Sequence, residues 1–117
     1  MEVAMPRVAF FAKVIAKPGQ RARLLALFDK ASEHAQREPG TLIYAVHAVD
    51  DESDAVYLYE LYEDAQAHRR HSDGHAVAVL RAGLPELVEE PIAVTKGLYH
   101  GGFGLCVEDP DDNPTET

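Results

Sequence analysis

An acidic residue and a row of histidines lie close together in the segment VYLYELYEDAQAHRRHSDGH, residues 56–75. On a strand, alternate residues point the same way, so Glu60 would share a face with apolar neighbours. On a following helix, residues three and four apart are neighbours, so His68, His71 and His75 would form a stripe. A buried carboxylate beside an imidazole is suited to proton transfer, and we therefore predict Glu60 and His71 as catalytic residues.

Structural roles for the same residues stay open. Burying Glu60 costs several kcal/mol unless it is paired or protonated, so it is either a base with a raised pKa or part of a structural ion pair. In the structural case its partner would be Tyr44 or a histidine. The spacing of the three histidines also suits a transition metal, but such sites recruit further ligands and no cysteine lies nearby. We predict no metal and no cofactor.

Apolar patterning predicts four strands and two helices around these residues. The first helix has an apolar stripe that begins with Leu24, Leu27 and Phe28. The second begins after an N-cap at Asp64 and ends near Gly83 and Pro85. The order β-α-β-β-α-β predicts a ferredoxin-like α+β sandwich, a four-stranded antiparallel sheet with both helices on one face. The predicted strands are residues 8–15, 41–49, 55–62 and 92–99, and the helices are residues 20–37 and from 65 onward.

The predicted strands are apolar on both faces. Phe10 and Phe11 are consecutive on the first strand, as are Leu58 and Tyr59 on the third. A sheet with one wet face alternates apolar and polar residues, and this one does not. At about 25 cal/mol per Å2, the exposed side chains would forfeit several kcal/mol of burial. We therefore predict a homodimer in which two sheets pack face to face.

Size and charge restrict the class of protein. The chain has 117 residues and a net charge of −9, and we predict one domain over residues 1–105. Residues 106–117 form an acidic tail with two prolines, predicted to be disordered. An acidic chain disfavours nucleic-acid and anionic membrane partners, and no apolar run approaches the roughly 18 residues of a membrane span. One cysteine, no leader pattern and no internal disulfide favour the cytoplasm.

Residues from Val8 to about Leu105 resemble the antibiotic biosynthesis monooxygenase family, small dimeric α+β barrel proteins. Separate segments carry the resemblance together, at matching spacings. They are the turn at residues 17–20, Glu38-Pro39-Gly40 with Tyr44 behind it, residues 59–64, and then Ala67, His71, Ser72 and His75.

The resemblance implies a cavity between the sheet and the helices. It also implies oxidation of electron-rich aromatic substrates, such as quinols or polyketide-type phenols, by O2 without metal, flavin or haem. An aromatic anion can pass one electron to O2, so the protein need only deprotonate and orient it. On this basis the small aromatic substrate would contact further residues of the cavity. These are Tyr44, Tyr62, His68, His75, Phe10, Leu24, Phe28 and Leu58.

Individual positions refine the resemblance. His71 matches the recurrent histidine of the second helix, and Tyr62 lies where the family often has tryptophan. His68 falls where some members have a tyrosine that lines the pocket. Leu58 replaces a polar residue of members that act on anthrones, which argues against that substrate class. Haem-degrading relatives need an asparagine on the first strand and a tryptophan on the third, and the chain contains no tryptophan.

Two other functions fit the same residues. An isomerase or cyclase could use Glu60 and His71 on a lactone or polyketide without oxygen. A binding module could hold a small aromatic molecule without changing it, because this fold has many functions. Turnover under anaerobic conditions separates the isomerase from the oxygenase.

Overall fold

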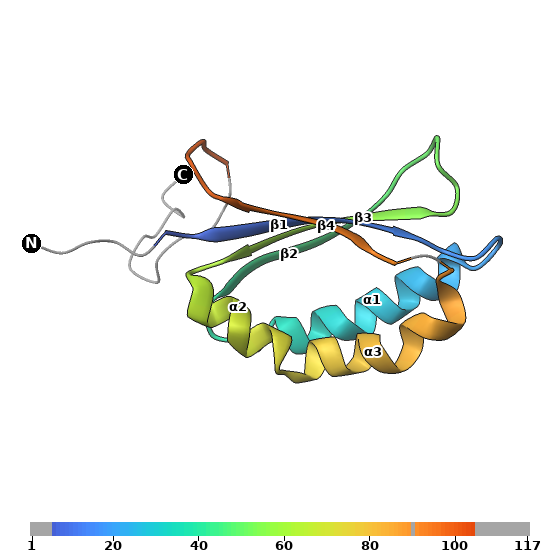
Figure 1. The fold of residues 1–117 in the computed structure, drawn as a ribbon, viewed down its shortest axis with the longest axis horizontal. Helices are drawn as coiled ribbons and strands as arrows, with labels where there is room; N and C mark the ends of the chain where they lie inside the picture. Colours follow the sequence, from blue (N-terminus) through green and yellow to red (C-terminus); the bar gives the residue numbers. More distant parts are fainter. Residues whose placement is uncertain (1–5, 90, 105–117) are drawn as a thin grey trace, which may run out of the picture.

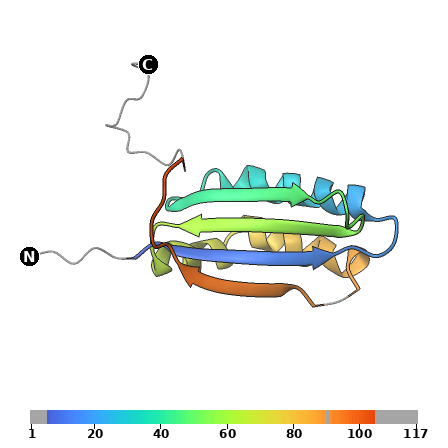
Figure 2. The ribbon, with the colours of Figure 1, turned by 90° about the horizontal axis from the view of Figure 1, so that it is seen from above.

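The chain forms one four-stranded antiparallel sheet covered on one face by helices (Figure 1). The computed structural model describes residues 6–89 and 91–104. The strands lie side by side in the order β2-β3-β1-β4, seen in Figure 2 with the helices behind them. The predicted ferredoxin-like α+β fold is confirmed. The elements are β1 (Val8–Ile15), α1 (Arg21–Ala35), β2 (Thr41–Ala48), β3 (Ala55–Tyr62), α2 (Ala65–Ser72), α3 (His75–Leu87) and β4 (Ala93–Leu98).

The second predicted helix is divided into α2 and α3, so the helical layer has three helices rather than two. Asp64 accepts a hydrogen bond from the backbone N–H of Ala67 at 2.8 Å, which confirms the predicted N-cap. The break falls at Asp73 and Gly74. Gly74 is extended, with φ −98° and ψ −172°, and a Cβ there would lie 3.1 Å from the carbonyl oxygen of Arg70. Because the chain bends at this point, α3 leaves in a new direction (Figure 1).

The predicted stop at Gly83 and Pro85 is wrong, because α3 continues to Leu87. A Cβ at Gly83 would lie 2.7 Å from Cδ1 of Leu27, so this glycine lets α3 approach α1 closely. Contact with α1 therefore holds the C-terminal part of α3 in place. Pro85 lies inside α3 and has no backbone N–H, so it cannot donate a helical hydrogen bond to the carbonyl oxygen of Arg81.

The core lies between the sheet and the helices. Leu24 and Phe28 of α1 are buried against Val14 of β1 and Val56 of β3. The register pairs Val14 with Val56, and Phe10 with Glu60, so both pairs project from the same face of the sheet. This register places the acidic residue over the helices, beside the apolar core.

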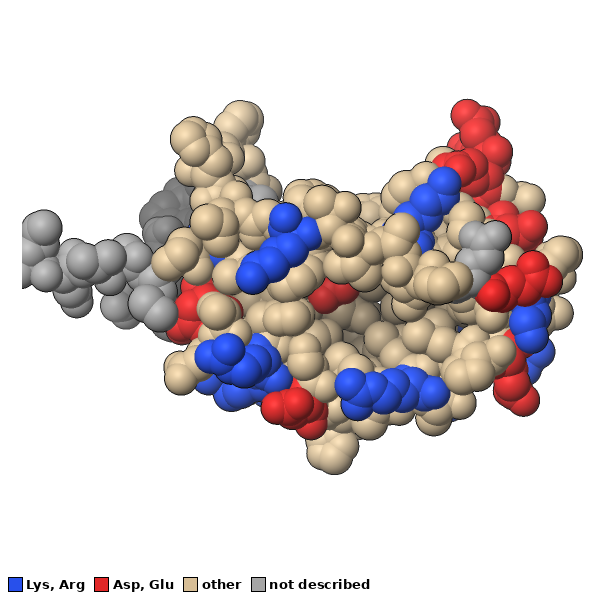
Figure 3. Space-filling view, viewed as in Figure 1, with Lys and Arg blue, Asp and Glu red and all other residues tan. Residues whose placement is uncertain are grey.

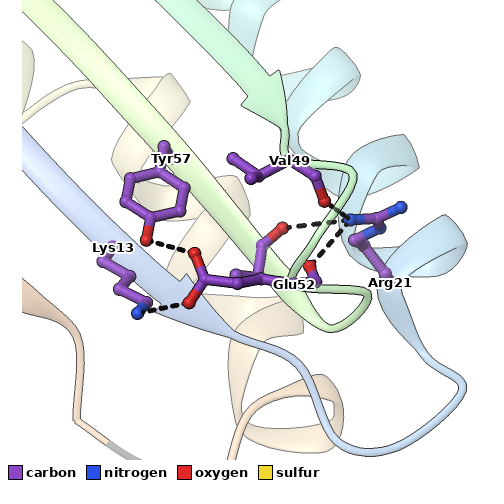
Figure 4. Close-up of polar contacts among 6 residues, drawn as sticks. Lys13, Arg21, Val49, Glu52 and Tyr57 are labelled. Carbon is purple, nitrogen blue, oxygen red and sulfur yellow. Dashed lines mark hydrogen bonds and ion pairs between the residues drawn. The ribbon is translucent and has the colours of Figure 1, made fainter.

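The β2–β3 loop rises from the opposite, uncovered face of the sheet (Figure 1). Glu52 in this loop accepts hydrogen bonds from Lys13 Nζ at 2.8 Å and from the hydroxyl of Tyr57 at 2.5 Å (Figure 4). Nη1 of Arg21 donates to the carbonyl oxygens of Val49 and Glu52, each at 3.0 Å. Both ends of the loop are therefore fixed to the body of the domain.

Two predictions concern the C-terminal tail and membrane-spanning segments. The acidic tail at residues 106–117, predicted to be disordered, lies outside them. In the part of the chain that is described, no helix combines the length and apolarity required to cross a bilayer.

Candidate active site

A cavity of about 290 Å3 lies between the sheet and the helices. It opens beneath the β4 edge, and Figure 3 shows this hollow with basic side chains on both sides of its mouth. Ten of its lining residues are apolar or aromatic hydrocarbon side chains, and five are polar. A mostly apolar cavity with a few convergent polar groups is typical of a small-molecule site. The polar lining residues are Tyr44, Glu60, His68, His71 and Ser72.

Glu60 projects from the middle of β3 into this cavity, and its side chain is 15% exposed. Its Oε1 accepts a hydrogen bond of 2.5 Å from the hydroxyl of Tyr62. Burial raises the pKa of Glu60, while the Tyr62 hydrogen bond and the charge of His71 oppose the shift. Glu60 is therefore a carboxyl group whose protonated and ionised forms are closer in energy near neutral pH than those of a solvated glutamate.

His71 of α2 is 4% exposed and connects two carboxylates. Its Nδ1 lies 2.7 Å from Oε1 of Glu38, and its Nε2 lies 3.9 Å from Oε1 of Glu60. The hydroxyl of Thr41 donates to the same Glu38 oxygen at 2.7 Å. The imidazole thus presents one nitrogen to a fixed partner and the other to the cavity.

Two tyrosines surround this acid–base group. The rings of Tyr44 and Tyr62 lie 5.6 and 5.2 Å from the His71 ring, measured between centroids. Burial raises the pKa of both phenols, and the negative charge of Glu60 raises it further. Both hydroxyls therefore remain protonated at neutral pH and act as hydrogen-bond donors.

His68 forms an aromatic wall with Phe10. The two rings are stacked, with centroids 4.0 Å apart and an interplanar angle of 22°. Burial lowers the pKa of His68, and the charges of His71 and Lys96 lower it further. Both residues line the cavity, so the stacked pair offers aromatic surface to a substrate ring.

Seven of the ten predicted site residues line the cavity. Of the other three, Leu24 is fully buried in the core, and Tyr62 is fully buried behind Glu60, which it contacts by its hydroxyl. The prediction that His75 shares the cavity is not met, because the helix break at Asp73 and Gly74 destroys the spacing that placed it there. His75 is exposed and packs its ring 5.7 Å from that of His34. The residues that do line it are Phe10, Phe28, Tyr44, Leu58, Glu60, His68 and His71.

Sequence reasoning assigned no role to Glu38, which lies in the connection between α1 and β2. Its position just before Pro39 and Gly40, ahead of Tyr44, was the only available signal. Apolar wall residues from α3 and β4 were also absent from the predicted site. These are Val77, Leu80 and Leu84 of α3, Val94 of β4 and Ile92 just before it, together with Ala12 and Val14 of β1. Within residues 6–89 and 91–104, no three histidine, cysteine or acidic side chains converge as a metal site would require.

The fold and the cavity together define a small α+β domain with an apolar site and groups for proton transfer. The sequence model of the family described as "Antibiotic biosynthesis monooxygenase" matches residues 7–82, and the chain belongs to this family. No curated protein matches the sequence.

Solved structures share the fold at low sequence identity. The protein NE2512 of unknown function from Nitrosomonas europaea is 24% identical, with a TM-score of 0.76 over 86% of this chain and 96% of that one. Rv0793 from Mycobacterium tuberculosis is 26% identical, with a TM-score of 0.76 over 84% and 99%. PA3566 from Pseudomonas aeruginosa is 19% identical, with a TM-score of 0.77 over 86% and 100%. These likenesses support the fold and leave the substrate unassigned.

Proposed function

We propose that this protein is a cofactor-independent monooxygenase that oxidises a small electron-rich aromatic or quinol with O2. The observation that carries the proposal is the position of Glu60 and His71. Oε1 of Glu60 and Nε2 of His71 lie 3.9 Å apart at the polar end of a mostly apolar cavity of about 290 Å3. Family membership supports oxygenase chemistry, and the cavity supports a small apolar substrate.

In the proposed reaction, Glu60 or His71 removes a proton from the activated ring substrate. The resulting anion gives one electron to O2, and the two radicals combine to form a C–O bond. Loss of water from the peroxide then breaks the O–O bond, so that a ring C–H, a phenolic O–H and O2 become two C=O groups and H2O. Proton removal by a positioned base contributes roughly 10²–10⁴-fold. The apolar walls exclude water from the radical pair.

The remaining lining residues would hold the substrate. We propose that the Tyr44 hydroxyl donates a hydrogen bond to the substrate oxygen. The substrate ring packs against the stacked pair of His68 and Phe10, both of which line the cavity. Phe28 and Leu58 close the apolar side of the cavity.

Oxygen uptake tests this proposal directly. With a panel of small hydroquinones and naphthols, we expect one O2 consumed per product and one atom of 18O2 incorporated. Glu60→Gln and His71→Ala should each lower uptake by at least tenfold, because each removes one half of the acid–base pair. The measurement is the initial rate at an oxygen electrode, with product mass spectrometry.

His100→Ala is the matched control, since it removes an exposed histidine of the segment after β4. Its rate should equal that of the unaltered protein. Normal turnover in both Glu60→Gln and His71→Ala would show that the chemistry takes place elsewhere.

A second function rests on the same geometry. A glutamate and a histidine on one cavity can move a proton between two carbons of a lactone or polyketide without any oxidant, which describes an isomerase or cyclase. Anaerobic assays separate the two, because product formation that continues without O2 belongs to the isomerase. Tight binding of an unchanged aromatic molecule would instead favour a binding module.

We further propose that two copies pack through the uncovered face of the sheet. Phe11 is 50% exposed at the centre of this face, with its ring 5.2 Å from that of Tyr59. The β2–β3 loop and the segment after β4 both rise on this side (Figure 1), leaving the apolar strands between them. An exposed apolar face between two raised segments suits a second copy of the same sheet.

Phe11→Glu should convert the dimer into a monomer, because two buried carboxylates would face each other across the two-fold axis. Light scattering coupled to size exclusion measures the mass. Ala26→Glu adds the same charge to an exposed position on the helical side and should leave the dimer intact. A dimeric Phe11→Glu protein would exclude this face as the interface.

A further inference from the structure

Glu38 lies next to the proposed catalytic pair but outside the cavity. It is in the connection between α1 and β2, and its side chain is 13% exposed. It does not line the cavity, whereas His71 and Glu60 do. The residue that joins Glu38 to the cavity by a direct polar contact is His71.

Glu38 makes two polar contacts through one carboxyl oxygen. Its Oε1 accepts from the Thr41 hydroxyl at 2.7 Å and lies 2.7 Å from Nδ1 of His71. A carboxylate oxygen only accepts hydrogen bonds, so a hydrogen bond between it and His71 requires a proton on Nδ1. A neutral imidazole carries its proton on one nitrogen, and the carboxylate attracts that proton to Nδ1.

The opposite nitrogen is then free to act as a base. Nε2 lies on the cavity side, 3.9 Å from Oε1 of Glu60. That oxygen already accepts the hydroxyl of Tyr62. Burial raises the pKa of Glu60, while the Tyr62 hydrogen bond and the charge of His71 oppose that shift.

We infer that Glu38 is a positioning residue that fixes the proton of His71 on Nδ1 and thereby makes Nε2 the base of the site. This inference rests on the proposed proton abstraction for its consequence, but the position of the proton is independent of the substrate. The two carboxylates then have different roles. Glu38 orients the imidazole, and Glu60 faces the reacting molecule.

A second feature indicates that Glu38 is placed for more than packing. Its other oxygen, Oε2, is buried and has no hydrogen-bond partner among the residues the structure describes. A buried acceptor without a partner costs about 1–3 kcal/mol. A residue chosen only for stability would not retain that cost, whereas one that orients a catalytic base can.

The test is the tautomer of His71, observed by NMR of protein labelled with 15N-histidine. The chain has six histidines, and the His71 signals are those lost in His71→Asn. At neutral pH we expect a protonated Nδ1 and an unprotonated Nε2. A proton on Nε2 in the unaltered protein would overturn the inference, whether or not any substrate is known.

Variants of Glu38 separate its acceptor from its charge. Glu38→Leu removes both the acceptor and the charge. The proton of His71 should then move to Nε2, where it can be donated toward Glu60. An unchanged tautomer would overturn the inference. Glu38→Gln keeps an acceptor oxygen of the same shape and should lower kcat roughly 10–100-fold with KM unchanged. An unaltered kcat, or a loss confined to KM, would contradict the positioning role.

Glu33→Gln is the matched control, because it makes the same change at an exposed position of α1 and should alter neither the tautomer nor kcat. The two proposals fail separately. Absence of oxygen uptake with every substrate would remove the monooxygenase and leave the tautomer result standing. Oxygen uptake by a protein whose His71 carries its proton on Nε2 would support the monooxygenase and overturn the role of Glu38.

Discussion

Gly40→Ala should destabilise the protein by about 2–4 kcal/mol, because the new methyl group is both strained and blocked. Gly40 has φ +88°, and a Cβ there would lie 2.5 Å from Cβ of Ala67. The carbonyl oxygen of Gly40 also accepts the backbone N–H of Glu63 at 2.8 Å, so the segment cannot move away freely. Urea unfolding at one protein concentration measures the change.

Gly19→Ala provides a matched control for the strain alone. Gly19 has φ +77°, but a Cβ there would have no atom within 4 Å. We expect a loss of about 1 kcal/mol, the ordinary cost of a left-handed alanine. The double variant Gly40→Ala with Ala67→Gly should recover part of the loss. Equal destabilisation by the two single alanine variants would show that the turn and α2 do not touch in solution.

Glu60→Gln should make the protein more stable at neutral pH by about 1–3 kcal/mol while turnover falls. Removing a buried charge relieves its desolvation, and the amide oxygen still accepts the hydrogen bond from Tyr62. Changes of opposite sign in stability and activity are expected of a group buried for its chemistry. Thermal and urea unfolding of both proteins measure the first change.

The stability advantage of Glu60→Gln should depend on pH. Because burial raises the pKa of Glu60 above its ordinary 4.5, the folded protein holds a proton that the unfolded chain has lost. The contribution of Glu60 to stability therefore falls as pH rises from about 4.5 to the raised pKa of Glu60 and is constant above it. Glu60→Gln has no such group, so its advantage should grow through that window.

The exposed Glu33→Gln variant should show no such growing advantage at any pH. A constant difference between Glu60→Gln and the unaltered protein across the window would mean that Glu60 titrates as a solvated carboxyl. A less stable Glu60→Gln protein at neutral pH would mean that the ion pair with His71 outweighs the desolvation of the carboxylate.

Local periodicity explains what could be predicted of the site. Glu60 faces the cavity because alternate residues of β3 share a face with the apolar core. His68 and His71 lie on one side of α2 because they are three residues apart. His75 is four residues beyond His71, but this spacing has meaning only in a continuous helix, and Gly74 interrupts it.

Contacts between distant segments explain what the sequence could not show. Glu38 lies 33 residues before His71 in a connection without periodicity, so no local pattern joins them. The continuation of α3 past Pro85 depends on contact between Gly83 and Leu27, which is a tertiary interaction. The antiparallel sheet and its single covered face, by contrast, follow from the order of the elements, and these were predicted correctly.

The β4 edge has a consequence for selectivity. Ile92 and Val94 line the cavity, yet they are 36% and 58% exposed, so this wall is thin and lies at the surface. A bound molecule would be enclosed at its reacting end and remain near water at the other. We expect recognition to be strict about the ring at the enclosed end of the cavity and permissive toward long substituents that project past β4.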